Sequence, residues 1–358
     1  MRFLIEIGHP AHVHLFRNAA RNLMAKGHQI KYTTRDKESA IQLLAAYGFD
    51  YEVRGDLKSG LIGKAAGMLS TDWRVYKVAR EFKPDVFLGV HNPYAAQVSR
   101  LMGKKSITFT DTEYVKFASM VTFPFTDTII TPTCFMEKLD PNKHVTVNGY
   151  KELAYLHPNY FTPDPAVVEE LGLSGGDPYI ILRFISWAAS HDVGLSGIAR
   201  GSELEFIKRL EEYGRVYVSS ERKLSSEMEK YRITAAPEKM HSLLYYARLY
   251  IGEGGTMAAE SAVLGTPAIH IEANSAGVAT GNFSGNFLEL RDRYGLLYFY
   301  SDQQQALAKA VEVLENADSK AEWQEKREIL LKEKVDVSAW LTDFLERYPE
   351  SFYEQRAC

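Results

Sequence analysis

Short apolar runs alternate with helical patterns in the first part of the chain. The run that opens the chain, residues 3–7, enters a strand directly, and a helix is predicted from the following loop to about Ala25, ahead of Gly27. Strands that alternate with helices are typical of a doubly wound parallel sheet. The predicted strands of this part are residues 3–7, 29–33, 86–90, 106–110 and 128–131.

This pattern breaks at residues 150–165, which are rich in Pro, Tyr and His without a regular period. Such composition is typical of an interdomain linker. A second α/β series follows, and from Asp302 the pattern is helical to the end. The predicted strands of the second series are residues 179–182, 215–219, 249–252 and 297–300.

Two Rossmann-like, doubly wound domains are therefore expected. A chain of 358 residues exceeds the size at which a single core usually keeps growing. We place an N-terminal domain at residues 1–155 and a second domain at residues 165–335, with a helix at residues 338–358 that packs back on the first. A ligand is expected in a central cleft, at the carboxyl ends of the strands.

Composition narrows the classes of partner. The net charge of −4 lacks the basic excess of a nucleic-acid-binding protein. Cys134 and Cys358 form no Cys-x-x-Cys pair, which indicates a reducing cytoplasm. The N-terminus does not read as a signal peptide, and no uncharged stretch is long enough to span a bilayer. We expect a cytoplasmic protein, peripheral to the membrane at most.

The most informative segment, residues 249–271, reads strand, glycine turn, short helix, strand. Gly254 and Gly255 suit a tight turn and leave no side chain between the helix N-terminus and a ligand, where free amides favour a diphosphate. Thr256 and Glu260 share one helical face, and the carboxylate is placed to accept from a ribose diol. Alternatively, the glycines only let the helix pack closely on the sheet. The strand context and the spacing of Glu260 favour the ligand site.

A cationic residue follows another strand of the second domain. The guanidinium of Arg183 is expected to neutralise the leaving diphosphate. Ser186, His191 and Asp192 belong to the same loop.

His12 is the candidate acid/base residue of the first domain. An imidazole with its ordinary pKa suits removal of a proton from an acceptor hydroxyl at neutral pH. The alternative is a histidine that caps or packs against the helix. His9 and His14 share the loop, but no cysteine or acidic triad completes a ligand set, so no metal is expected.

Asp111 and Glu113 follow another strand end of the same predicted sheet. They are candidates for an alternative base or for ligands of sugar hydroxyls. The other interpretation is a solvated turn.

Residues 56–70 give no secure periodicity, because apolar residues alternate irregularly with lysines and glycines. A mobile flap is one interpretation. The other is a patch that lies on anionic lipid, a peripheral membrane contact.

The chain resembles the GT-B glycosyltransferases and the non-hydrolysing UDP-N-acetylglucosamine 2-epimerases. The strongest likeness is Gly252-Glu-Gly-Gly-Thr-Met-Ala-Ala-Glu260 followed by Leu264-Gly-Thr-Pro267, which is similar to the donor-binding motif of the enzymes that add N-acetylglucosamine to lipid I. This resemblance implies phosphate contacts at the glycine turn and a ribose contact at Glu260. It also implies that the turn containing Met240 and His241 offers backbone groups to the uracil.

The loop Gly8-His-Pro-Ala-His12-Val-His14 resembles the first loop of the same enzymes, although Pro10 and Ala11 replace glycines. The whole pattern, with Arg183-Phe-Ile-Ser-Trp-Ala-Ala-Ser-His-Asp192, resembles a group of prokaryotic proteins classed as domain of unknown function 354. In the epimerase comparison Glu113 matches a catalytic glutamate. The upstream catalytic aspartate has no counterpart, since His91 and Asn92 stand there.

The resemblance implies a metal-independent glycosyltransferase without a cofactor. Its donor substrate is expected to be a nucleotide-diphosphate sugar, UDP-linked, and its acceptor a polysaccharide, cell-envelope glycan or lipid-linked glycan. A UDP-sugar 2-epimerase or hydrolase is one alternative. A non-catalytic nucleotide-sugar binder is the other.

Overall fold

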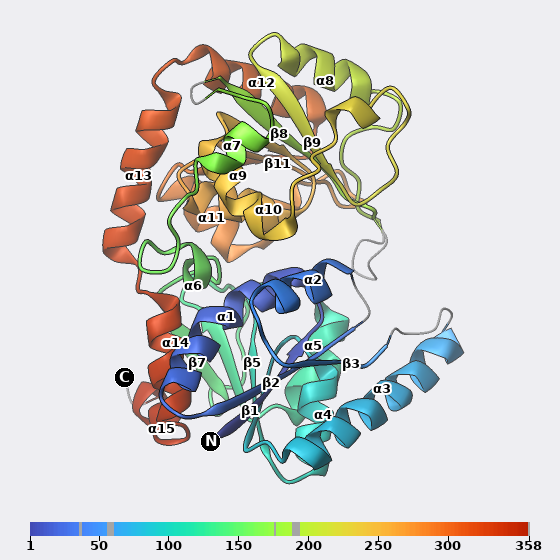
Figure 1. Cartoon of the computed structure of the whole chain (residues 1–358), viewed down its shortest axis with the longest axis vertical. Helices are drawn as coiled ribbons and strands as arrows, with labels where there is room; N and C mark the ends of the chain where they lie inside the picture. Colours follow the sequence, from blue (N-terminus) through green and yellow to red (C-terminus); the bar gives the residue numbers. More distant parts are fainter. Residues whose placement is uncertain (36–37, 56–60, 175–176, 188–193, 357–358) are drawn as a thin grey trace. The chain divides into compact units, whose positions relative to one another are not determined.

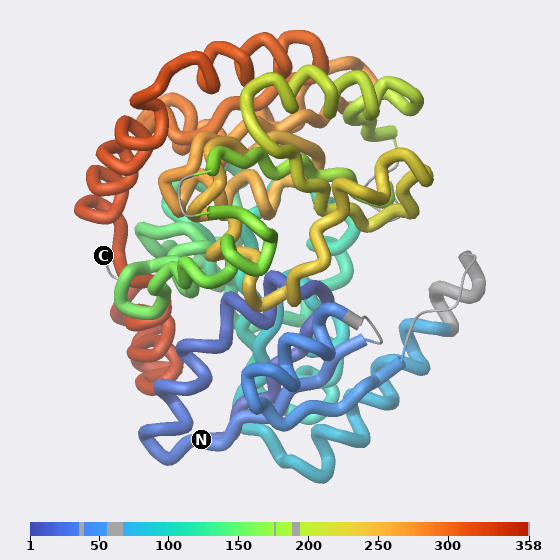
Figure 2. Tube along the Cα trace, turned by 45° about the horizontal axis from the view of Figure 1, so that its top comes forward, coloured from blue at the N-terminus to red at the C-terminus, as the bar shows by residue number. Residues whose placement is uncertain are grey.

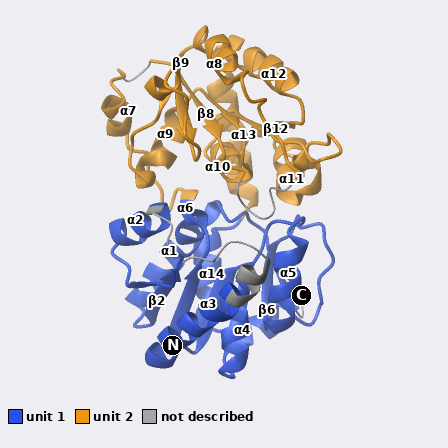
Figure 3. Ribbon diagram, turned by 90° about the vertical axis from the view of Figure 1, so that its right-hand side faces the viewer, with its two compact units in different colours: residues 1–155, 335–358 blue, residues 156–334 orange. Residues whose placement is uncertain are grey.

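A computed structural model describes residues 1–35, 38–55, 61–174, 177–187 and 194–356 of the chain (Figure 1). It divides into two compact units, coloured separately in Figure 3. Unit 1 comprises residues 1–155 and 335–358, and unit 2 comprises residues 156–334. Each unit is built on one parallel sheet with helices packed around it, so the predicted fold class is confirmed.

The described residues of unit 1 contain a seven-stranded sheet with the order β3-β2-β1-β4-β5-β6-β7. Its strands are β1 (Arg2–Ile7), β2 (Gln29–Thr34), β3 (Tyr51–Val53), β4 (Val86–Val90), β5 (Lys105–Phe109), β6 (Thr128–Pro132) and β7 (His144–Val147). After Arg2 every residue of β1 is buried, as is typical of a parallel strand covered on both faces. The strand order reverses between β1 and β4, and open α/β sheets bind ligands beside such a switch point.

Helices lie on both faces of this sheet (Figure 1). They are α1 (Pro10–Ala25), α2 (Glu38–Ala46), α3 (Leu61–Phe82), α4 (Pro93–Leu101), α5 (Lys116–Thr122), the 3-10 turn η1 (Phe123–Phe125), α14 (Val337–Glu346) and α15 (Glu350–Arg356), with α6 (Leu153–Leu156) at the boundary between the units. The helix α1 starts directly after β1, because His9 caps it by accepting the Ala11 N–H and Pro10 occupies its first turn.

The C-terminal helices belong to unit 1, where α14 lies beside α1 (Figure 2). Asn22 Nδ2 on α1 donates to Thr342 Oγ1 on α14 over 3.2 Å, and Ser338 Oγ donates to the Ala154 carbonyl over 2.6 Å. The apolar stripe of α14 is buried at Leu341, Phe344 and Leu345. These contacts fix the last part of the chain to the first domain of the sequence.

Two segments differ from the sequence-based expectation. Residues 61–70, for which the sequence gives no secure periodicity, form the first part of α3, while residues 56–60 lie outside the described part of the chain. The helix is held by its later turns, where Val75 and Ala79 are fully buried in the core with Phe87 of β4. A short-range pattern in residues 57–70 could not reveal this anchor.

The start of the predicted linker is buried. Tyr150, Leu153 and Tyr155 are all 0% exposed. Aromatic and aliphatic side chains of this size gain about 1.5–3 kcal/mol each from burial, so the segment packs although it has no period. The boundary between the two units, after Tyr155, falls within the predicted linker, and the first residues of that linker are buried.

The described residues of unit 2 contain a five-stranded sheet with the order β12-β11-β10-β8-β9. Its strands are β8 (Tyr179–Phe184), β9 (Arg215–Ser220), β10 (Leu249–Gly252), β11 (Ala268–Ile271) and β12 (Leu297–Tyr300). Its α-helices are α7 (Ala166–Glu170), α8 (Glu203–Glu211), α9 (Met240–Tyr246), α10 (Gly255–Val263), α11 (Gly285–Asp292), α12 (Gln303–Glu315) and α13 (Ser319–Glu333). The order reverses between β8 and β10, so α10 begins beside the switch point.

One face of α13 donates hydrogen bonds to the ends of two other helices. Lys320, Gln324 and Arg327 lie on this face, spaced by about one helical turn. Their acceptors are the backbone oxygens of Tyr245, Ala247, Val263, Leu264 and Gly265. The last carbonyls of a helix have no partner within the helix, so α13 satisfies the C-terminal ends of α9 and α10.

We predict that Gln324→Ala lowers the free energy of unfolding by about 1–3 kcal/mol, because the side chain donates to the buried carbonyls of Leu264 and Gly265 over 3.0 and 2.8 Å. Urea denaturation measures this. The matched control is Glu325→Ala, an exposed position on the same helix, which should change the free energy by less than about 0.5 kcal/mol. Equal effects of the two substitutions would contradict the capping role.

Candidate functional site

The glycine turn of unit 2 joins β10 to α10. Gly254 is the N-cap residue and has φ +82°, a conformation that favours glycine. A Cβ atom on Gly252 would lie 2.5 Å from the carbonyl oxygen of Arg183, so only glycine allows β10 to approach β8 this closely. The turn therefore brings the first amides of α10 to the carboxyl edge of the sheet without any capping side chain.

Glu260 is buried in the middle of α10, with 4% of its surface exposed. Its Oε1 atom lies 3.1 Å from Nε2 of His241 on α9. An ionised carboxylate only accepts hydrogen bonds, so this geometry requires the imidazole to donate from Nε2. The structure thus pairs two residues that the sequence indicated separately.

The side chain of His241 has a contact that the sequence did not predict. The resemblance implies only backbone groups at Met240 and His241, which begin α9. The imidazole of His241 is 3% exposed and points to Glu260 instead of solvent. Because 19 residues separate the pair in the sequence, no local pattern reveals it.

Glu253 is a buried carboxylate that sequence reasoning missed. It is 0% exposed, and its two oxygens accept the backbone N–H groups of Ile185 and Ile198, each over 2.9 Å. Burial raises the pKa of Glu253 to about 7, although both N–H groups favour the ionised form. The residue ties the chain after β8 to the turn before α10. The sequence signal that could have indicated this residue is its position between Gly252 and Gly254 at the end of a strand.

Arg183 lies within β8, which continues to Phe184, two residues beyond the predicted strand end. Its guanidinium donates to Ser219 Oγ over 2.7 Å and forms an ion pair with Glu221 at 2.5 Å. Ser186 Oγ donates to the other oxygen of Glu221 over 3.3 Å. Arg183 and Ser186 are thus joined through Glu221 beside the glycine turn. His191 and Asp192 lie outside the described residues.

His12 lies in the first turn of α1, at the carboxyl end of β1. Its Nδ1 atom accepts the backbone N–H of Gly8 over 3.3 Å, so the neutral ring carries its proton on Nε2. His9, not His12, is the capping residue. For Nε2 to take up a proton, the neutral ring would have to carry its proton on Nδ1 instead, and His12 would lose its contact with the Gly8 N–H. The sequence did not reveal this contact.

Asp111 and Glu113 are buried, with 7% and 5% of their surfaces exposed, so the solvated-turn interpretation is wrong. Asp111 Oδ2 accepts from Lys151 Nζ over 2.6 Å, and Glu113 Oε1 accepts the N–H of Met136 over 3.3 Å. Lys151 follows β7 in the sequence and was not predicted. The ion pair offsets the desolvation of Asp111, which a carboxylate needs when it is buried.

His91 follows β4 at the same edge and has φ +41°, uncommon for a residue with a side chain. Its ring lies 2.9 Å from Thr110 Oγ1 and 3.0 Å from Ser119 Oγ, and it stacks on Phe123. Burial lowers the pKa of His91 to about 4, against the opposing charge of Asp111. The imidazole is therefore neutral at pH 7, a hydrogen-bonding group and not a cation.

The first 279 residues match the family model described as "Protein of unknown function (DUF354)". The chain belongs to the DUF354 family. An uncharacterized protein of Methanocaldococcus jannaschii, MJ0665, is 25% identical to this DUF354 protein over 285 residues, covering 74% of this chain and 80% of the relative.

Solved structures are similar to this DUF354 protein in fold. The UDP-GlcNAc 2-epimerase of Methanocaldococcus jannaschii, in complex with UDP-GlcNAc and UDP, has a TM-score of 0.63 at 15% identity, covering 89% of this chain and 94% of that one. The Streptomyces sp. SF2575 glycosyltransferase SsfS6, complexed with thymidine diphosphate, has a TM-score of 0.62 at 12% identity, covering 97% and 99%. The predicted likeness to GT-B glycosyltransferases and epimerases is confirmed at the level of the fold.

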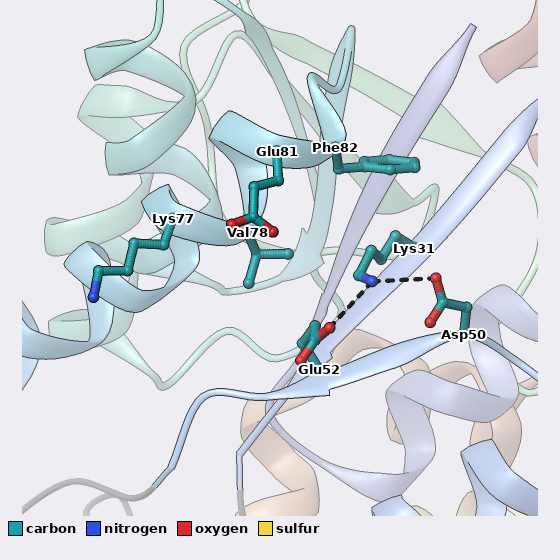
Figure 4. A pocket seen from close by; sticks show the side chains of 7 residues that line it. All are labelled: Lys31, Asp50, Glu52, Lys77, Val78, Glu81 and Phe82. Atoms are coloured by element: carbon teal, nitrogen blue, oxygen red, sulfur yellow. Dashed lines mark hydrogen bonds and ion pairs between the residues drawn. The ribbon is translucent and has the colours of Figure 1, made fainter.

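Two surface cavities in unit 1 do not contain the candidate residues. One, of about 370 Å³, lies near the start of β2 and β3, where Lys31 bridges Asp50 and Glu52 over 3.2 and 3.3 Å (Figure 4). The other, of about 500 Å³, is lined by Lys105, Asp127 and other residues near the amino ends of β5, β6 and β7. Ligand sites of open α/β sheets lie at the opposite, carboxyl ends of the strands.

In the part of the DUF354 chain that the structure describes, no helix is both long and apolar enough to cross a bilayer. The same residues contain no group of three or more His, Cys, Asp and Glu side chains placed to hold a metal ion. Leu69 and Trp73 on α3 are 73% and 55% exposed. The membrane contact through residues 57–70 stays a prediction, and residues 57–60 lie outside the described part.

We predict that His91 makes the protein sensitive to acid. The pKa of His91 is about 4 in the folded protein against 6.5 ordinarily, so the unfolded chain binds the proton more readily and stability falls as the pH drops from 6.5 to 4. A shift of this size corresponds to about 3 kcal/mol. Asparagine tolerates the positive φ at this position, so His91→Asn should fold but lose this pH-dependent part of the free energy of unfolding.

Urea denaturation of both proteins at pH 7, 5.5 and 4 tests this prediction. The difference in unfolding free energy between wild type and His91→Asn should shrink toward acid pH. Parallel pH profiles for the two proteins would show that His91 does not titrate as described.

Proposed function

We propose that this DUF354 protein is a metal-independent glycosyltransferase of the GT-B type that uses a nucleotide-diphosphate sugar, UDP-linked, in polysaccharide or cell-envelope glycan synthesis. The observation that carries this proposal is the turn at Gly254 and Gly255, which opens the N-terminus of α10 one helical turn before the buried Glu260. An anion fits the amides, and a diol fits the carboxylate.

The diphosphate of the donor is assigned to the first turn of α10. The N–H groups of Gly255 and Thr256 have no partner within the helix. An exposed helix N-terminus stabilises an anion by only about 0.3–1 kcal/mol, so a cation is needed as well. Arg183 is adjacent, because its backbone pairs with Gly252 across the sheet. Its guanidinium would share its charge between Glu221 and the leaving diphosphate.

Fold similarity does not select the nucleotide. One structural neighbour holds UDP-GlcNAc and UDP, and another holds thymidine diphosphate. Glu260 favours a ribonucleotide, since a carboxylate accepts from both hydroxyls of a ribose diol. This supports UDP over thymidine diphosphate as the nucleotide of the donor.

Acceptor activation is assigned to unit 1. In sugar transfer the bond from the sugar's anomeric carbon to the diphosphate breaks, the acceptor oxygen forms the new bond, and its proton passes to a base. His12 is the candidate base, with Asp111 and Glu113 as the alternative base or as ligands of sugar hydroxyls. The ion pair with Lys151 holds the Asp111 carboxylate in place, which suits it to accept from a sugar hydroxyl.

An epimerase or hydrolase is the second candidate, favoured by the epimerase fold similarity and by the position of Glu113. Epimerisation requires acid and base groups at the sugar. His91 stands where the resemblance places a catalytic aspartate, and it is a neutral imidazole with a lowered pKa. This difference favours transfer. A non-catalytic nucleotide-sugar binder is the third candidate.

UDP should stabilise the protein through the turn at Gly254. At one hundred times its dissociation constant, a ligand adds about 2.7 kcal/mol to the free energy of unfolding, which a thermal shift detects. Gly254→Ala should abolish the shift, because its Cβ would lie 2.9 Å from Ile185 Cγ2 at φ +82°. Gly172→Ala is the matched control, since Gly172 has φ +69° and no atom within 4 Å of an added Cβ.

If UDP raises the melting temperature of Gly254→Ala as much as that of the wild type, the diphosphate does not bind at this turn. If UDP, GDP, CDP and ADP all fail to stabilise the wild-type protein, the proposed function is wrong.

His12→Ala should reduce sugar transfer about 10²–10⁴-fold while leaving UDP affinity nearly unchanged, because the base belongs to unit 1 and the nucleotide to unit 2. The assay follows labelled sugar from UDP-N-acetylglucosamine into cell-envelope glycan acceptors. His9→Ser is the control, because serine still caps α1 but removes a neighbouring imidazole. Equal activity of His12→Ala and wild type would exclude His12 as the base.

Incubation of UDP-N-acetylglucosamine alone with the wild-type protein in deuterated water separates the reactions. A transferase leaves the sugar C2 proton in place. Incorporation of deuterium at C2 would overturn transfer in favour of epimerisation. Tight UDP binding without transfer or exchange would favour the non-catalytic binder.

A further inference from the structure

The buried pair of His241 and Glu260 joins two helices of unit 2. The imidazole is 3% exposed and the carboxylate 4% exposed, with 3.1 Å between Nε2 and Oε1. A buried carboxylate without donors would be costly, so the imidazole N–H fixes where the carboxylate points. The pair therefore determines the direction of the only acidic side chain in α10.

The first residues of unit 2 pack against the imidazole and the start of α9. Phe161 contacts His241 edge to face, with 6.2 Å between ring centroids and an interplanar angle of 88°. Ser242, which follows His241 in α9, accepts the backbone N–H of Asp164 at its Oγ over 3.1 Å. These contacts hold the start of α9 and leave His241 little freedom to turn away from Glu260.

The carboxylate lies one turn, about 5.4 Å, along α10 from Thr256 and the amides at its N-terminus. A ribose linked to a diphosphate at those amides has its two hydroxyls on the side away from the phosphates. A carboxylate presents two oxygens with about four acceptor positions, so Oε1 can bind His241 while the group still accepts from a diol.

We propose that His241 is a positioning residue, which orients Glu260 toward a ribose diol and so makes unit 2 selective for ribonucleoside over 2′-deoxyribonucleoside diphosphates. This inference rests on the proposed function, because it assumes that a nucleoside diphosphate binds at α10. It assigns to the His241 side chain a role distinct from the backbone contact to the base.

Isothermal calorimetry with UDP and 2′-deoxy-UDP tests the proposal. The wild-type protein should bind UDP about 10- to 100-fold more tightly, because the deoxy sugar lacks one donor to Glu260. His241→Phe keeps a ring of similar shape but cannot donate, so UDP affinity should fall until the two affinities are nearly equal. Glu260→Gln should have the same effect.

Two further variants separate positioning from packing. His241→Gln places an amide N–H near the position of Nε2 and should restore most of the preference for UDP, whereas the shorter His241→Asn should not. Ser242→Ala removes a neighbouring contact of the same helix and should leave the preference unchanged. Circular dichroism shows whether each variant folds. If His241→Phe does not fold, the comparison of the glutamine and asparagine variants still tests the role of His241.

An unchanged preference for UDP in His241→Phe, or in His241→Asn, would overturn the role of His241 while leaving the proposed function intact. The same holds if wild type binds both nucleotides equally. If wild type binds neither nucleotide, the proposed function fails together with this inference.

Discussion

The two ends of α10 differ in their hydrogen bonds: side chains satisfy the carbonyls at its C-terminus, and no side chain caps the amides at its N-terminus. At its C-terminus Gln324 and Arg327 of α13 donate to carbonyls that the helix itself cannot satisfy. At its N-terminus glycine stands where a capping side chain would, so no side chain caps the first amides. The helix dipole points the same way, so the partial positive charge faces the carboxyl edge of the sheet. The candidate site follows from this asymmetry.

Buried carboxylates organise the surroundings of α10. Glu253 binds two backbone N–H groups on neighbouring loops, and Glu260 binds an imidazole from the next helix. Each pairing offsets the desolvation of a charge, and each fixes a loop or a side chain at the same edge. Unit 1 uses the same device, where Lys151 neutralises Asp111. Both sheets therefore carry polar groups at their carboxyl ends without exposing them.

The glycosyltransferase proposal draws on these groups in different ways. In the proposed function the α10 amides would bind the ligand from positions that the backbone fixes, and Glu260 from a position that its contact with His241 fixes. His12 depends on its tautomer, which the Gly8 N–H sets in this structure. His91 is a neutral group whose environment opposes protonation. The proposed donor binding thus relies on groups in fixed positions. The proposed proton transfer relies on imidazoles whose protonation depends on the groups around them.

The sequence by itself determined most of the parallel strands, although not β3 and β7, together with the glycine turn and the place of Glu260 on α10. Continuous apolar runs and glycines with positive φ are local constraints, which is why these predictions needed no tertiary information. Only the tertiary structure decided the helix at residues 61–70, the burial of Tyr150 and the pairing of His241 with Glu260. Those features depend on contacts between residues far apart in the sequence, where burial selects partners that local periodicity cannot encode.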